Sequence, residues 1–218
     1  MQKIIHQMWI GPYNMLDRDK VLCDKIKHMN PDFEYMFWNN DNLPELPDKL
    51  NKLLIYFSNN DGFDIRIADM IRLYIIYEYG GLYIDCDYDI KNPLNNLNLP
   101  DKDGFIHLNH SMTDSTICHS IHGFQKHHPM SKFIIDNISD CWLGPHFFGQ
   151  WVKAYLNMSP SDTNDNIVHS KLLDLNILSN NSIEQLRIEW GMYHLGSATW
   201  LGENQKKLEK NNEFVGFT

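Results

Sequence analysis

Apolar and polar positions near the start of the chain alternate between strand-like and helix-like patterns. Residues 3–10 alternate loosely and end at a Gly-Pro pair, which predicts a strand followed by a turn. Residues 16–29 carry apolar side chains at helical spacing, and the short aromatic run 33–38 predicts a second strand. A strand, a helix and a strand in this order indicate an α/β unit.

The strongest helical periodicity covers residues 65–79, with Asp64 as the expected N-cap. Gly80 and Gly81 follow directly, and glycine commonly ends a helix. Residues 82–84 are apolar and predict a short buried strand that runs into two aspartates.

Beyond residue 100 the pattern is weaker. We expect a strand at residues 105–109 and a helical stretch after Pro129. A turn at 143–148, a second helix at 151–156 and a linker at 159–166 should follow.

Length and composition limit the fold and the partners. The 218 residues, 43% of them hydrophobic, suffice for a substantial core, and no repeat or compositional shift divides them. We therefore expect a single α/β domain over residues 1–218, with a mostly parallel central sheet flanked by helices. The 19 basic and 28 acidic residues give a formal net charge of −9, which argues against a nucleic-acid partner.

The sequence shows neither a membrane-spanning segment nor a secretory signal. No apolar run approaches the roughly 18–20 residues needed to span a bilayer, and the N-terminus lacks the pattern of a signal peptide. The four cysteines lie far apart with no C-x-x-C pair, which suggests free thiols in a reducing compartment. We expect a soluble or cytoplasmic chain without a transmembrane segment.

Six of the eleven histidines fall between His107 and His128, close to Cys118. The spacing Cys118-x-x-His122 raises the possibility of structural zinc, but no second ligand pair at zinc-finger spacing accompanies it. An ordinary polar surface is the favoured interpretation, followed by a wall of an acceptor pocket.

The most informative motif is Asp85-Cys86-Asp87, directly after the predicted buried strand. Side chains two residues apart on an extended chain point the same way, so both carboxylates can address one ion. Ligands of open α/β sheets collect at the carboxyl ends of strands, and oxygen ligands suit Mg²⁺ or Mn²⁺. The alternative is a polar loop after an edge strand.

Two further groups accompany this motif. Asp69 and Arg72 lie three residues apart on one face of the predicted helix, and such an arginine can hold a phosphate, although an exposed ion pair is the simpler reading. His194 and Trp200 bracket a short flexible segment, where the simpler readings are a core histidine and a packed indole.

Four segments, in this order, carry a resemblance: Lys3–Gly11, Ala68–Tyr74, Gly80–Asp87 and His194–Trp200. The set resembles the DXD-containing sugar-nucleotide glycosyltransferases of the fungal initiating α-1,6-mannosyltransferase and lactosylceramide α-1,4-galactosyltransferase type, related to the large clostridial glucosylating toxins. The resemblance implies a GT-A fold with a Rossmann-like nucleotide-sugar-binding sheet.

The resemblance also implies a donor site. Trp9 would stack on the nucleotide base, Asp69 and Arg72 would hold the donor sugar and its diphosphate, and Tyr83 would lie against the ribose.

The metal site implied by the resemblance consists of Asp85, Asp87 and His194, binding Mn²⁺ or Mg²⁺. Asp85 would also contact the donor, and Ser197 and Trp200 resemble groups that contact the β-phosphate. The C-terminal match is looser, because two additional residues separate Ser197 from Trp200.

The implied activity is a retaining, metal-dependent transfer of a hexose from a UDP- or GDP-sugar to a glycan, lipid or protein acceptor, with Asp69, Arg72 and Asp87 as catalytic residues. Two alternatives remain open: a catalytically silent sugar-nucleotide or glycan-binding module, and a phosphatase in which Asp85 is the nucleophile and Asp87 the acid.

Overall fold

The computed structural model describes residues 1–58, 65–109, 116–138, 145–159, 161–162, 164–182 and 184–195. The strands are β1 (Ile4–Trp9), β2 (Glu34–Asn39), β3 (Gly81–Ile84), β4 (Tyr88–Ile90), β5 (Gly104–Asn109), β6 (Thr116–Phe124), β7 (Ile177–Ser179) and β8 (Met192–His194). The α-helices are α1 (Asp17–Met29), α2 (Asp48–Ser58), α3 (Ile65–Tyr79), α4 (Pro129–Asn137), α5 (Pro145–Tyr155) and α6 (Asp165–Asp174). Short helical turns are η1 (Leu94–Leu97), η2 (Leu99–Asp101) and η3 (Gln185–Glu189).

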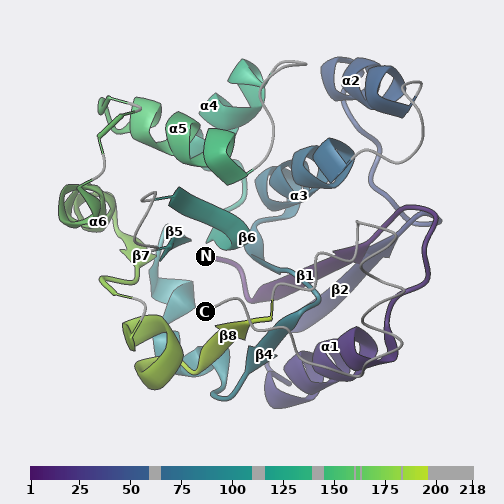
Figure 1. Cartoon of the computed structure of the whole chain (residues 1–218), viewed down its shortest axis with the longest axis horizontal. Helices are drawn as coiled ribbons and strands as arrows, with labels where there is room; N and C mark the ends of the chain where they lie inside the picture. Colours follow the sequence, from purple (N-terminus) through teal and green to yellow (C-terminus); the bar gives the residue numbers. More distant parts are fainter. Residues whose placement is uncertain are drawn as a thin grey trace.

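Six strands form one sheet in the order β2-β1-β3-β6-β5-β7, and β4 and β8 form a separate pair (Figure 1). Strand β1 is parallel to both β2 and β3, and β7 is parallel to β5. Strand β6 alone runs against its neighbours β3 and β5. The predicted mostly parallel sheet is therefore confirmed.

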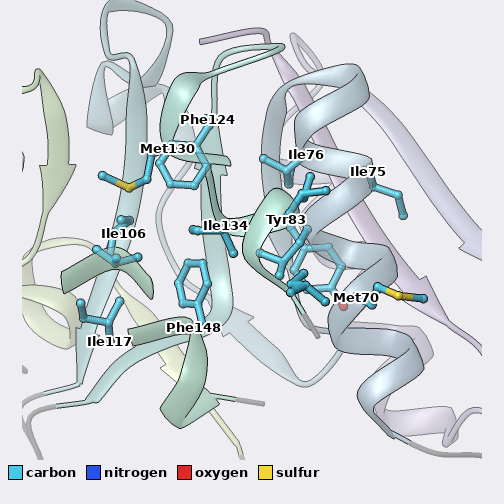
Figure 2. Close-up of a cluster of buried hydrophobic side chains, with 14 of the residues drawn as sticks. Met70, Ile75, Ile76, Tyr83, Ile106, Ile117, Phe124, Met130, Ile134 and Phe148 are labelled. Carbon is cyan, nitrogen blue, oxygen red and sulfur yellow. The ribbon is translucent and has the colours of Figure 1, made fainter. Parts of the chain in front are cut away.

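Apolar side chains cover both faces of this sheet, as a largely parallel sheet requires. Successive side chains of β3 point to opposite faces of the sheet. Tyr83 packs in a core with α3, α4 and α5, whereas Leu82 and Ile84 pack in a second core with α1 and η1. Figure 2 shows the first core, where side chains of α3 and α4 meet those of β5 and β6. No helix in the described ranges is long and apolar enough to cross a membrane.

The helix α3 and the strand β3 are joined by two glycines that no other residue could replace without strain. Gly80 and Gly81 have φ angles of +69° and +97°. A Cβ on Gly81 would lie 2.5 Å from the backbone oxygen of Ile4 on β1. The Gly-Gly pair therefore ends α3 and lets β3 lie close against β1.

Most sequence predictions before residue 110 are confirmed, and the later ones are less accurate. The predicted turn at 143–148 is wrong for residues 145–148, because α5 begins at Pro145, and proline at a first helical position gives up no helical hydrogen bond. The predicted linker at 159–166 already contains the start of α6, where the Asn164 side chain accepts a hydrogen bond from the Ile167 N–H. Residues 143–144 lie outside the described ranges.

A buried histidine ties β1 to β2 and to the end of α3. The Trp38 indole N–H donates to His6 Nδ1 at 3.1 Å, and His6 Nε2 lies 2.8 Å from the Gly80 carbonyl oxygen. The imidazole therefore accepts at Nδ1 and donates from Nε2, which fixes the neutral form. Burial lowers the pKa of His6 to about 4, against the opposing effect of the Gly80 hydrogen bond.

This histidine predicts a loss of stability in mild acid. The pKa in the folded state lies below the unfolded value of 6.5, so the contribution of His6 is complete above pH 6.5 and falls as the pH drops toward about 4. Between pH 7.5 and pH 5.0, His6 should remove about 2 kcal/mol from the free energy of unfolding. Urea unfolding of wild type and His6→Gln at both pH values measures this difference.

His28→Gln, which replaces an exposed histidine on α1, is the matched control and should keep the wild-type pH dependence. An equal acid loss in wild type and His6→Gln would contradict the assignment.

Candidate active site

The predicted site residues gather at the edge of the sheet where β1 and β3 end. Asp85 follows β3 directly, and its backbone N–H donates to the Ser120 carbonyl oxygen of β6 at 2.8 Å. The pairing of Tyr88 with His194 brings β8 back beside the aspartates, and the Leu195 N–H donates to the Asp87 carbonyl oxygen at 3.0 Å. Residues more than one hundred positions apart therefore meet at Asp87.

A buried arginine stands at the centre of the site, between two carboxylates. Arg72 Nη2 lies 3.2 Å from Asp69 Oδ1, and Arg72 Nη1 lies 3.0 Å from Asp85 Oδ1. The Tyr83 hydroxyl donates to the same Asp85 oxygen at 2.8 Å, and the guanidinium lies over the Tyr83 ring at 4.9 Å. Asp69 and Arg72 are only 3% and 6% exposed, so the reading of an exposed helix ion pair is wrong.

His119 on β6 completes this arrangement, and no sequence pattern singled it out. His119 Nε2 lies 2.8 Å from Asp69 Oδ1, the oxygen that also contacts Arg72. Burial alone would raise the pKa of Asp69, but His119 and Arg72 outweigh it and hold this pKa below its usual value. Asp69 is thus a buried anion with two cationic partners.

The two aspartates of the D-x-D motif have a more open environment. One ligand atom each of Asp85, Asp87 and His194 lies within 4.8 Å of the other two, and His194 Nε2 is 3.3 Å from Asp87 Oδ1. The His194 ring stacks on the Tyr88 ring at 4.8 Å. Burial raises the pKa of Asp85, and the charge of Asp87 adds to this effect while Arg72 opposes it.

This donor set fits a divalent ion. Two carboxylates and one imidazole are ligands that Mn²⁺ accepts, and Mg²⁺ would use the two carboxylates preferentially. The His194 side chain is 36% exposed, which leaves the cluster open to a ligand on one side. In the part of the chain that the structure describes, no other group of three histidine, cysteine, aspartate or glutamate ligands meets the same distance limit.

Of the other residues predicted to bind the sugar-nucleotide donor, the structure describes Trp9. Trp9 ends β1 at the same edge of the sheet, and its indole N–H donates to the Tyr13 carbonyl oxygen at 2.8 Å. Ser197 and Trp200 lie outside the described residues.

The histidine-rich segment is not an ordinary polar surface, which corrects the favoured sequence interpretation. His107, His119 and His122 are buried, and His119 and His122 both lie against the Phe148 ring of α5. Burial lowers the pKa of His122 to about 3, with the charge of His119 adding to the effect. Within the described ranges, Cys118 and His122 belong to no group with metal-ligand spacing.

Comparison with known proteins identifies part of the chain. Residues 17–103 match the family model described as a glycosyltransferase sugar-binding region containing a DXD motif. This stretch of the chain is therefore similar to the DXD glycosyltransferase family. The match includes Asp69, Arg72, Asp85 and Asp87, and therefore most of the cluster described above.

Named relatives of the DXD region are fungal enzymes. The chain is 26% identical over 151 residues to inositol phosphoceramide mannosyltransferase 3 of Schizosaccharomyces pombe (strain 972 / ATCC 24843), covering 66% of this chain and 39% of that protein. It is 29% identical over 138 residues to inositol phosphoceramide mannosyltransferase 2 of the same organism, covering 62% and 38%. The chain thus spans about two fifths of the length of these relatives.

The fold also has a known counterpart. The structure named PaToxG Glycosyltransferase superimposes with a TM-score of 0.52 at 15% identity, covering 80% of this chain and 75% of that one. At this identity the likeness concerns the fold alone. Together with the sheet order, it shows that the DXD region lies in a GT-A type fold.

The buried position of Arg72 predicts strong energetic coupling to Asp69. In a double-mutant cycle with Asp69→Asn and Arg72→Gln, the two substitutions should be non-additive by more than about 1 kcal/mol, because each removes one of the buried partners of the other charge. Urea unfolding of the wild type, both single variants and the double variant gives the coupling energy.

Lys132 and Asp136 provide the matched control, since they form an ion pair within α4 with both side chains more than half exposed. Their coupling should be about 0.3–0.5 kcal/mol. Equal coupling energies for the two pairs would contradict the structural role assigned to Arg72.

Proposed function

We propose that the protein is a retaining, metal-dependent glycosyltransferase that moves a hexose from a UDP- or GDP-sugar to a glycan, lipid or protein acceptor. The observation that carries the proposal is the convergence of Asp85, Asp87 and His194 beside the buried Arg72. The family match over residues 17–103 supports it independently of this geometry.

Within the proposal, Asp85 and Asp87 on the loop after β3 and His194 on β8 would hold the ion together. A bound Mn²⁺ or Mg²⁺ would stabilise the negative charge that develops on the leaving nucleoside diphosphate. Arg72 orients Asp85 through one nitrogen and Asp69 through another, so these two carboxylates keep fixed positions before the donor arrives.

The donor would lie between this ion and the end of β1. Within the proposal, Trp9 would stack on the base and Asp69 would hold the sugar. Arg72 Nε is buried and finds no hydrogen-bond partner among the described residues, which leaves one donor of the guanidinium for a ligand oxygen. Tyr83 holds Asp85 through its hydroxyl, so its support of the donor is indirect.

Retention of configuration is proposed to proceed on one face of the sugar, without a covalent intermediate. The acceptor hydroxyl attacks from the side on which the diphosphate leaves, and the bond to the leaving oxygen breaks as the new glycosidic bond forms. The acceptor proton leaves with the diphosphate oxygen, so no side chain of the chain has to act as a nucleophile.

The names of the two fungal relatives guide the choice of substrates. Both are named for mannosyl transfer to inositol phosphoceramide. A mannosyl donor and an inositol-phosphate lipid acceptor are therefore the first pair to test within the broader proposal.

Metal-dependent nucleotide binding is the first expected result. With Mn²⁺, either UDP or GDP at 100 times its dissociation constant should stabilise the protein by about 2.7 kcal/mol, and EDTA should abolish most of this effect. Asp87→Asn should lose the metal-dependent part because one carboxylate ligand is gone. Thermal-shift measurements with each nucleotide, with Mn²⁺ and with EDTA, record these changes.

Asp89→Asn is the matched control, because Asp89 is held by Lys25 and Lys91 and is not part of the cluster. It should keep the metal-dependent shift. The metal assignment fails if Asp87→Asn behaves like wild type, or if both variants lose the shift equally.

Turnover distinguishes the enzyme from a silent binding module. Incubation with an α-linked sugar nucleotide and an acceptor should give an α-linked product, visible in the anomeric proton signal of an NMR spectrum. A β-linked product would contradict retention. Nucleotide binding without release of the diphosphate, across the common donors, would favour the binding module.

A further inference from the structure

Two neighbouring strands place a tyrosine ring against the histidine of the candidate metal cluster. Strands β4 and β8 lie side by side (Figure 1), and Tyr88 is directly opposite His194 in their antiparallel register. The side chains of such a pair share one face of the ribbon, so the two rings meet. Their centroids are 4.8 Å apart and their planes differ by 11°. One face of the His194 imidazole is therefore covered by Tyr88.

The Tyr88 ring is itself held from the main sheet. Tyr88 is fully buried, and its hydroxyl oxygen lies 2.8 Å from the Ser120 hydroxyl oxygen and 3.3 Å from His107 Nδ1. Ser120 lies on β6 and His107 on β5, so these contacts join the β4–β8 pair to the six-stranded sheet. Tyr88 is thus fixed at its backbone by β8 and at its hydroxyl by the main sheet.

Ser120 supports the cluster in two ways. Residues 119–121 of β6 have no counterpart on β5, which marks a bulge, and bulges often redirect groups beside active sites. Within this bulge the Ser120 carbonyl oxygen accepts the Asp85 N–H at 2.8 Å, while the Ser120 hydroxyl contacts Tyr88. One residue of β6 therefore supports the backbone of one candidate ligand and the ring that covers another.

His194 has more need of such support than Asp85, which is held by its ion pair with Arg72. His194 ends a three-residue strand, and its side chain is 36% exposed. Its Nε2 lies 3.3 Å from Asp87 Oδ1. The ring contact with Tyr88 restricts rotation of the imidazole and keeps Nε2 turned toward Asp87.

We propose that Tyr88 is a positioning residue that holds the His194 imidazole toward the metal, and that it thereby gives the site a preference for Mn²⁺ over Mg²⁺. The Tyr88 ring holds the imidazole, and the Tyr88 hydroxyl, through Ser120, holds the ring. This inference rests on the metal site of the proposed function.

The preference follows from the chemistry of the ligands. Mg²⁺ keeps several waters and binds to proteins through one or two carboxylates. Ions of the first transition row gain more from an imidazole nitrogen, so Mn²⁺ depends on His194 more than Mg²⁺ does. Removing the group that orients a metal ligand typically lowers metal affinity by about 10–100-fold. Loss of the Tyr88 ring should therefore weaken Mn²⁺ binding far more than Mg²⁺ binding.

The test is Mn²⁺ binding to the intact chain, measured from the electron paramagnetic resonance signal of free Mn²⁺, with Mg²⁺ as the competitor. Tyr88→Leu should weaken Mn²⁺ binding by at least about tenfold and Mg²⁺ binding by less than about threefold. Tyr88 also packs in the core with Leu82 and Ile84, and a merely structural role would lower both affinities together. An equal effect on the two ions, or no effect on Mn²⁺, would overturn the proposal.

Tyr77→Leu is the matched control, because Tyr77 on α3 forms another tyrosine–histidine ring pair, with His127 at 5.0 Å, outside the metal cluster. It should keep the wild-type affinities for both ions. In a His194→Ala background, Tyr88→Leu should not change the ratio of the Mn²⁺ and Mg²⁺ affinities any further. A further fall in that ratio would contradict action through His194.

Tyr88→Phe tests the hydroxyl, and it decides the question if Tyr88→Leu does not fold. Phenylalanine keeps the ring and nearly all of the side-chain volume but loses the contact with Ser120. The preference for Mn²⁺ should therefore lie between those of the wild type and Tyr88→Leu. A wild-type ratio of the two affinities in Tyr88→Phe would overturn the role of the anchored ring.

The same titrations distinguish failure of this inference from failure of the proposed function. The metal site stands and the role of Tyr88 is wrong if the wild type binds Mn²⁺, Asp87→Asn loses this binding and Tyr88→Leu keeps the wild-type ratio. If the wild type binds no Mn²⁺, the proposed metal site and the role of Tyr88 are both wrong.

Discussion

The site depends on one buried cation. Arg72 lies between Asp69 on its own helix and Asp85 at the end of β3. Arg72 is only 6% exposed, so water cannot replace these carboxylates as partners of its guanidinium. Removing one of these carboxylates would leave the buried guanidinium with a single anionic partner, which costs more than losing a surface ion pair. Gly80 and Gly81 connect α3, which carries Arg72, to β3, which leads to Asp85, and they allow β3 to pack closely against β1. Fold and site are therefore coupled through α3, Gly80-Gly81 and β3.

Around this centre the site divides into a rigid and an open part. Asp69, Arg72 and Tyr83 are buried, so their positions are fixed. Arg72 is ion-paired with Asp69, and Tyr83 packs against the guanidinium and donates a hydrogen bond to Asp85. Asp87 and His194 lie on the loop after β3 and on the short strand β8, where a ligand can approach. This division suits preorganisation, since the buried groups need no rearrangement when charge develops on a leaving group.

Sequence reasoning predicted the parts of the fold that rest on local pattern. The helix 65–79, the glycine stop and the D-x-D strand end follow from periodicity and turn chemistry, and the structure confirms them. Strand β6 was missed because its inward positions carry histidine and serine, which apolar alternation cannot detect. His119 was not predicted either, because its importance comes from its contact with Asp69, fifty residues earlier in the chain. The proximity of His194 to Asp87 came from family resemblance, since spacing alone carries no information across more than one hundred residues.

The most direct test of the account is the position of a bound metal ion. A crystal of the protein grown with Mn²⁺ and the stabilising nucleotide should show one anomalous scattering peak between Asp85, Asp87 and His194, with Arg72 still bridging Asp69 and Asp85. A peak elsewhere, such as beside His107 and Cys118, or nucleotide bound without any ion at the aspartates, would contradict the central claim that the buried arginine preorganises a metal-dependent donor site.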